Sequence, residues 1–127
     1  MEIIKEKRLK KLKKLLDMTG INYERELKEI LHSKGWLVFR SAGSFVCDLI
    51  ALRPNEHKLI EVKSTKRDKY YTSDSKEQFD VLNNLAKEGF NVWYYMRWKN
   101  KKPKWSTYQL PLESYPIFLF KKEKEVN

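Results

Sequence analysis

The fold is decided by residues 45–63, which read FVCDLIALRPNEHKLIEVK. Two apolar, β-rich runs flank the turn residues 53–56, so this stretch predicts a β-hairpin. Both predicted strands carry charge where a buried strand is expected to be apolar: Asp48 in the first, and Glu61 with Lys63 in the second. Burying such groups is costly unless something pairs with them. The hairpin therefore predicts a polar site built into a sheet.

Helical and strand patterns surround the hairpin on both sides. Apolar residues at helical spacing predict a helix over 22–34, and Asp74 with Glu77 resembles a capping box at the start of a second helix over 74–88. The remaining elements are strands at 36–40, 91–98 and 105–110, and a polar loop at 64–73. The order of one helix, three strands, one helix and two strands indicates a single α/β domain, a mixed sheet flanked by helices.

Composition limits the classes of protein that are possible. The 127-residue chain carries 27 Lys and Arg against 17 Asp and Glu, a formal net charge of +10. Its single cysteine, Cys47, excludes an internal disulfide framework and a Cys-rich zinc site. No apolar run approaches the roughly 20 residues that a membrane span needs, so no membrane role is expected. The N-terminus lacks the apolar block of a secretion signal, so an intracellular protein is expected. The excess of positive charge predicts a negatively charged partner, nucleic acid first.

Residues 1–19 form a basic N-terminal extension, and residues 20–127 are the predicted domain. Leucines recur at helical spacing in the extension among many lysines, which is typical of a basic amphipathic helix. Two interpretations stay open. The extension is either a solvated segment or an arm that follows a phosphate backbone or packs on a partner subunit.

Asp48 and Glu61 are expected to lie close together across the predicted hairpin. Two carboxylates on adjacent strands repel unless a cation joins them, and such an oxygen-rich site suits Mg²⁺, with the Val62 carbonyl as a further ligand. The ion would polarise a phosphodiester and lower the pKa of a bound water. Lys63 would orient that water or stabilise the transition-state phosphate, and Glu24 would hold a water from the side. The alternative is a cross-strand ion pair at a sheet edge.

These residues resemble a known family. Asp48, twelve further residues and then Glu61-Val62-Lys63 is similar to the PD-(D/E)XK nuclease pattern, with Cys47 in place of the proline. Together with YEREL at 23–27 and GWLVFRSAGS at 35–44, the pattern resembles archaeal-type Holliday junction resolvases, the Hjc family.

The resemblance covers about residues 20–98 and implies a restriction-endonuclease-like fold. It implies a homodimer that recognises four-way DNA junctions and makes paired, Mg²⁺-dependent nicks in opposing strands, with Mn²⁺ as a substitute. It also implies a place in the cytoplasm or nucleoid of an archaeal or virus-infected host cell. The implied catalytic residues are Glu24, Asp48, Glu61 and Lys63. The positions implied in DNA binding or in support of the site are Arg25, Arg40, Ser41, Ser44, Lys66, Arg67 and Tyr71.

Two basic clusters and an aromatic strand lie outside the predicted metal site. The clusters, at 63–69 and 97–104, predict a phosphate-binding surface. Both faces of the strand at 91–98 carry aromatic residues. One face is expected to form a subunit interface, with stacking on junction bases as the second interpretation.

Two other functions fit the same sequence. One is another nuclease of this fold, of the restriction-like, repair or RNA-processing kind, and cleavage of linear duplex in preference to a junction would favour it. The other is a non-catalytic DNA-binding protein, for which Asp48→Asn would leave every activity intact.

Overall fold

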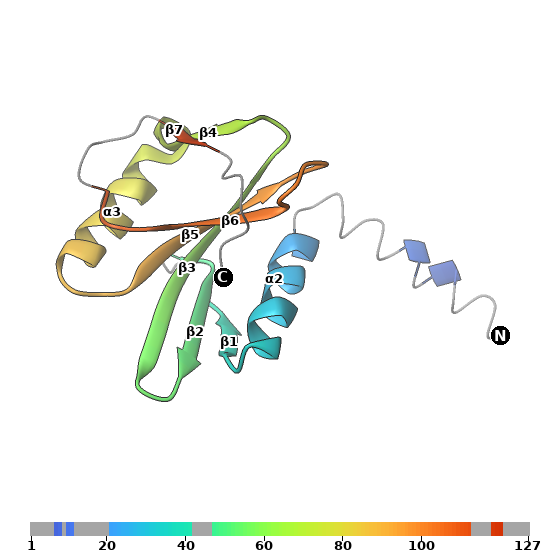
Figure 1. Cartoon of the computed structure of the whole chain (residues 1–127), viewed down its shortest axis with the longest axis horizontal. Helices are drawn as coiled ribbons and strands as arrows, with labels where there is room; N and C mark the ends of the chain where they lie inside the picture. The colour runs from blue at the N-terminus through green and yellow to red at the C-terminus, as the bar shows by residue number, and fades with distance from the viewer. Residues whose placement is uncertain (1–6, 9, 12–20, 42–46, 113–117, 121–127) are drawn as a thin grey trace.

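A five-stranded mixed sheet with one helix on each face forms the body of the molecule (Figure 1). The structure, a computed structural model, describes residues 7–8, 10–11, 21–41, 47–112 and 118–120. The helices are α2, Ile21–Ser33, and α3, Lys76–Lys87, which follows the 3₁₀ turn η1, Thr72–Ser75. The strands of the main sheet are β1 Leu37–Arg40, β2 Leu49–Arg53, β3 Glu56–Thr65, β5 Val92–Trp98 and β6 Trp105–Gln109.

The strand order in the main sheet is β1-β2-β3-β5-β6. Strands β3 and β5 are parallel, and every other neighbouring pair is antiparallel. A parallel pair needs a crossover connection, and the segment that contains α3 supplies it. This arrangement confirms the predicted α/β fold, a mixed sheet flanked by helices in one domain.

The predicted hairpin is formed by β2 and β3. Its turn contains Asn55 in the left-handed conformation with φ 61°, which asparagine tolerates better than most residues. The register places Leu49 opposite Ile60, and the Asp48 amide continues the ladder by donating to the Ile60 carbonyl at 3.0 Å. The predicted proximity of Asp48 to Glu61 follows from this register.

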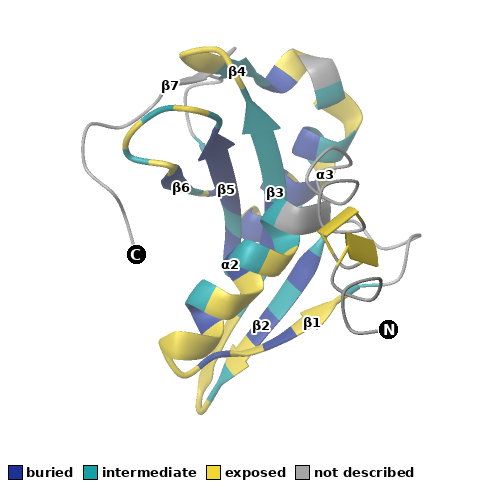
Figure 2. Cartoon of the chain, turned by 90° about the vertical axis from the view of Figure 1, so that its right-hand side faces the viewer, coloured by how far each residue is buried: buried dark blue, intermediate teal, exposed yellow. Residues whose placement is uncertain are grey.

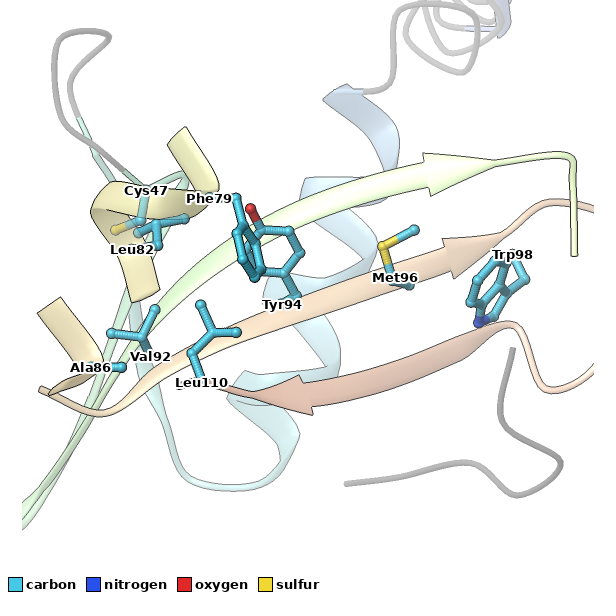
Figure 3. Packing of buried hydrophobic residues seen from close by; sticks show 9 residues of the cluster. All are labelled: Cys47, Phe79, Leu82, Ala86, Val92, Tyr94, Met96, Trp98 and Leu110. Carbon is cyan, nitrogen blue, oxygen red and sulfur yellow. The ribbon is translucent and has the colours of Figure 1, made fainter. Parts of the chain in front are cut away.

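Both faces of the aromatic strand β5 are covered. Tyr95 packs in a cluster with Leu27 and Leu31 of α2. On the other face, Tyr94 and Met96 pack in the cluster that includes Phe79 and Leu82 of α3 (Figure 3). The prediction that one face of this strand forms a subunit interface is therefore wrong.

The segment predicted as a loop at 64–73 contains a short strand, β4, Lys69–Tyr71. It pairs with β7, Phe118–Phe120, in a separate two-stranded sheet. The capping-box prediction is also wrong, because the turn η1 intervenes and the N-cap of α3 is Ser75, which makes no side-chain capping bond.

Of the basic extension, residues 7, 8, 10 and 11 are described, and they are helical and exposed. The division between residues 19 and 20 stays a prediction. None of the helices in the described part of the chain has the length and apolar character that crossing a bilayer requires.

Candidate active site

Two carboxylates face each other at the junction of β2 and β3. The Val62 amide donates to Asp48 Oδ2 at 2.8 Å, which holds that side chain against β3. Glu61 is 1% exposed. Burial first, and then a hydrogen bond and like charge from Asp48, raise the pKa of Glu61 to about 9. The structure therefore brings the two predicted carboxylates together, in a setting that disfavours two negative charges.

Two carboxylate oxygens in this cluster are buried without donors. Glu61 Oε2 accepts no hydrogen bond from any residue that the structure describes, nor does Glu24 Oε2, although Arg40 Nε lies 3.2 Å from it. Burial and the charge of Asp48 raise the pKa of Glu24, against the opposing effect of Arg40. Buried polar atoms are normally paired, so these oxygens call for an explanation.

A hard divalent cation would satisfy these oxygens. Among the described residues, no group of three or more acidic, histidine or cysteine side chains is placed to hold a metal ion. A Mg²⁺-like ion needs no such cluster, since it keeps several waters and binds through one or two carboxylates. The N–H and C=O of a strand residue point to the same side, so the Val62 carbonyl shares the side of Asp48. Asp48, Glu61 and Val62 thus fit the ion, with Glu24 beside them.

Lys63 lies on the same strand as Glu61, two residues further on. Its Nζ donates to Gln78 Oε1 of α3 at 3.0 Å, and its charge opposes the rise in the pKa of Glu61. Sequence reasoning missed Gln78. The available signal was its position four residues before Leu82, which puts a polar side chain at the edge of the buried face of α3.

Ser41 supports Asp48 through the backbone. Its amide donates to the Asp48 carbonyl at 3.0 Å, and its hydroxyl donates to the Cys47 carbonyl. Ser44, the other predicted serine, lies outside the described residues. Cys47 is buried, and burial raises the pKa of its thiol to about 11, so the thiol stays neutral at physiological pH.

A hollow of about 190 Å³ opens beside Glu24. It brings together two of the predicted DNA-binding residues, Arg25 and Arg40, and adds Lys28, which sequence reasoning missed. All three cations are exposed. Cationic side chains around a carboxylate cluster are suited to a phosphate that approaches it.

The other two predicted cations, Lys66 and Arg67, are exposed on the loop between β3 and β4. The two basic clusters meet here, because the Lys99 amide donates to the Thr65 carbonyl at 2.9 Å and Lys101 pairs with Asp68. We call the segments 66–69 and 99–104 together the basic ridge.

The prediction for Tyr71 stays a prediction, and the prediction that Arg97 belongs to a phosphate-binding surface is wrong. Tyr71 is half-buried on β4, which pairs with β7 in the small sheet. Arg97 was grouped with the second basic cluster, but it is buried and pairs with Glu26 of α2. Its alternation along β5 points it to the face that α2 covers.

The mixed sheet with carboxylates and a lysine on its central strands matches the fold of a solved Holliday junction resolvase. Hjc from Archaeoglobus fulgidus, an archaeal hyperthermophile, superposes with a TM-score of 0.54 and 26% sequence identity, over 69% of this chain and 73% of that chain. The chain belongs to the archaeal Holliday junction resolvase (Hjc) family, whose family model matches residues 16–123.

A second relative agrees at the level of sequence. Crossover junction endodeoxyribonuclease Hjc from Methanocaldococcus jannaschii is 43% identical over 63 residues, which make up 50% of this chain and 46% of that relative. The match thus spans about half the length of either protein. The family predicted from the sequence motifs is confirmed.

Proposed function

We propose that this chain is a Mg²⁺-dependent endonuclease that resolves four-way DNA junctions as a homodimer. The observation that carries the proposal is the pair of the half-buried Asp48 and the buried Glu61, with Lys63 beside it, in a chain of the Hjc family. The relatives' names, a crossover junction endodeoxyribonuclease and a Holliday junction resolvase, support the substrate. We infer an intracellular site of action, in an archaeal or virus-infected cell.

The metal would be held by oxygens of Asp48, Glu61 and Val62. When bound, Mg²⁺ would supply Lewis acidity to the phosphodiester and lower the pKa of the attacking water. Glu24 would hold a water molecule at the side of the site. Mn²⁺ prefers the same oxygen ligands, so it is expected to substitute.

Lys63 would act on the phosphate or on the nucleophile. Hydrolysis joins a water oxygen to phosphorus and breaks the bond from phosphorus to the departing strand. Negative charge accumulates on the phosphate oxygens in the transition state, and a fixed ammonium group stabilises it. Gln78 holds that ammonium group in place at 3.0 Å, so it does not need to reorganise during the reaction.

The DNA backbone would cross the cations on both sides of the carboxylates. Arg25, Lys28 and Arg40 line the hollow beside Glu24, and the basic ridge lies where β3 ends. Contacts of this kind fix the position of a duplex without reading its sequence. They also predict that affinity for DNA falls steeply as salt concentration rises.

An exposed apolar patch on the edge of the sheet supports the homodimer. Leu37, Phe39, Leu52 and Phe90 are each more than 40% exposed. Leu37 pairs with Leu52, which in turn pairs with His57, and the His57 ring contacts Phe90 edge-on. Figure 2 shows how exposed β1 is at this edge. Neighbouring apolar side chains on an uncovered edge strand are typical of an interface. A second copy of this chain suits a substrate with two equivalent strands, because each active site then faces one of them.

A synthetic four-way junction and a matched linear duplex test the proposal. Each is incubated with wild type or Asp48→Asn, in Mg²⁺ or in EDTA. We expect paired nicks in the junction with wild type and Mg²⁺, none in EDTA, and none with Asp48→Asn, which still binds the junction.

The other outcomes contradict the proposal in distinct ways. Preferential cleavage of the linear duplex would identify another nuclease of this fold. Unchanged activity of Asp48→Asn would identify a DNA-binding protein whose carboxylates have no chemical role.

A further inference from the structure

The ion pair between the buried Arg97 of β5 and the half-buried Glu26 of α2 joins the helix to the sheet. Arg97 is 8% exposed, and its Nε donates to Glu26 Oε1 at 3.2 Å. The indole Nε1 of Trp105 on β6 donates to the same oxygen at 2.7 Å. We call Glu26, Arg97 and Trp105 the clamp, because they tie one oxygen of the helix to two neighbouring strands.

The clamp also holds Tyr23, the residue before Glu24. The Arg97 guanidinium lies 5.0 Å from the centroid of the Tyr23 ring and 5.9 Å from that of Trp105, distances at which a cation attracts an aromatic face. Tyr23 and Glu26 are three positions apart and so lie on one side of the helix. The clamp therefore contacts the N-terminal half of α2 on the side that faces β5 and β6.

Glu24 projects from the opposite side of the same helical turn. Two positions along an α-helix correspond to a rotation of about 200°, so Glu24 and Glu26 point in nearly opposite directions. Glu26 is fixed against β5 and β6, whereas Glu24 lies 3.2 Å from Arg40 and interacts electrostatically with Asp48. Any rotation of α2 that loosens the clamp moves the Glu24 carboxylate relative to Asp48.

The groups of the clamp are better suited to fixing the orientation of α2 than to stabilising the fold. A buried ion pair adds little net stability over apolar packing, but a planar guanidinium and an indole N–H fix where a carboxylate oxygen lies. Leu27 and Leu31 already attach α2 to the sheet by apolar packing. Such packing is non-directional, so it leaves the rotation of the helix less well defined.

We propose that the clamp is a positioning device that sets the rotation of α2, so that Glu24 meets the Asp48–Glu61 pair. None of its members is among the residues proposed to hold the metal or to act on the phosphate. The inference rests on the proposed function, because it assigns a purpose to the placement of Glu24 in that site.

Two conservative variants test the clamp. Trp105→Phe removes the N–H donor and keeps an aromatic ring, and Glu26→Gln keeps an oxygen acceptor and removes the charge. For Trp105→Phe we expect kcat for junction cleavage to fall about tenfold, since small misplacements in a site have such effects. Mn²⁺ affinity, measured by calorimetry without DNA, should weaken as well. Affinity for the junction in EDTA should stay within about twofold of wild type, since base and phosphate contacts are untouched.

The turn between β2 and β3 offers a matched control. There Arg53 lies 4.1 Å over the Trp36 ring and pairs with Glu56, the same three residue types as in the clamp. Glu56→Gln disrupts that group at the other end of the hairpin from Glu61. We expect kcat and Mn²⁺ affinity to match wild type.

A double-mutant cycle with Glu24→Gln separates positioning from general support of the fold. If the clamp acts through Glu24, adding Trp105→Phe to Glu24→Gln lowers kcat and Mn²⁺ affinity no further. Additive losses overturn the inference, as does a Trp105→Phe protein that melts earlier but keeps wild-type kcat and Mn²⁺ affinity. A wild-type chain that neither binds Mn²⁺ nor nicks the junction overturns the proposed function itself.

Discussion

The two ends of the β2–β3 hairpin treat charged side chains in opposite ways. At the turn, Arg53 pairs with Glu56 and donates to the Lys34 carbonyl at 3.2 Å. Lys58 donates to the Tyr95 hydroxyl at 2.9 Å and lies 4.7 Å from the centroid of the Trp93 ring. Every one of these cations has a protein partner.

At the other end of the hairpin, the carboxylates are only partly balanced by Arg40 and Lys63. Oxygens of Glu61 and Glu24 are buried without a donor from the described residues, and burial raises the pKa values of both carboxyl groups. The contrast shows that charged side chains on a strand do not by themselves mark a functional site. Buried carboxylate oxygens without donors do, because a ligand is then needed to offset the cost of burying them.

The largest effect is expected from Lys63→Met, which removes the ammonium group beside the unbalanced carboxylates. We expect the cleavage rate at saturating Mg²⁺ to fall about 100-fold or more, because preorganised charge at a transition state has this magnitude. Single-turnover cleavage of a labelled junction measures it. A rate near that of wild type would contradict the view that the Asp48–Glu61 end of the hairpin is the functional one.

A smaller effect is expected at the apolar patch, where apolar side chains rather than carboxylates lack a partner in the described structure. Phe39→Asp should weaken dimerisation about 30-fold, since a central aromatic side chain carries much of the binding energy of an interface. Light scattering across a dilution series measures the change. Its control is Asn84→Asp on the exposed face of α3, which should stay dimeric.

The raised pKa of Glu61 makes the stability of the metal-free protein depend on pH. In the folded protein Glu61 keeps its proton up to about pH 9, whereas in the unfolded chain it loses that proton near its ordinary pKa of 4.5. The unfolded state therefore binds fewer protons in this window, and the free energy of unfolding falls as pH rises through it. Glu61→Gln removes this titrating carboxyl group, so the free energy of unfolding should depend less on pH.

Urea denaturation in EDTA, at several pH values between these limits, measures the slope for both proteins. Glu88→Gln, at an exposed carboxylate, is the control and should follow wild type. Equal slopes for wild type and Glu61→Gln would show that Glu61 is ionised in the folded state. Saturating Mg²⁺ should reduce the slope, because the cation stabilises the ionised carboxylate.

The smallest effect is expected from Lys58→Met, the match to Lys63→Met on the same strand. Methionine keeps the apolar contact with Trp36 and Trp93 while the charge is lost. Junction cleavage should stay within about twofold of wild type, as for substitutions away from a site. A large loss would mean that the turn end also contributes to function.

Local pattern was enough to predict the hairpin and its charges. A period of two placed Glu61 and Lys63 on one face of β3, and the turn at 53–56 set the register that brings Asp48 beside them. The pairing of β4 with β7 was missed, because three-residue strands give too weak a pattern. Their partnership depends on segments far apart in the sequence.

Contacts between helices and strands could not be predicted from the sequence pattern of each element taken alone. Gln78 and Glu26 are ordinary polar residues of amphipathic helices until the helix crossings place them against Lys63 and Arg97. Arg97 was misassigned for the same reason. Its basic neighbours in sequence indicated an exposed position, whereas the partner that allows its burial comes from a helix some seventy residues earlier.

The bonds from Ser41 to the Cys47 and Asp48 backbone give this serine two separable contributions. Its amide donates to the Asp48 carbonyl, so any residue other than proline at position 41 can keep that bond. The bond to the Cys47 carbonyl instead depends on the serine hydroxyl. Ser41→Ala therefore isolates what one hydroxyl group adds to the placement of the backbone directly before Asp48.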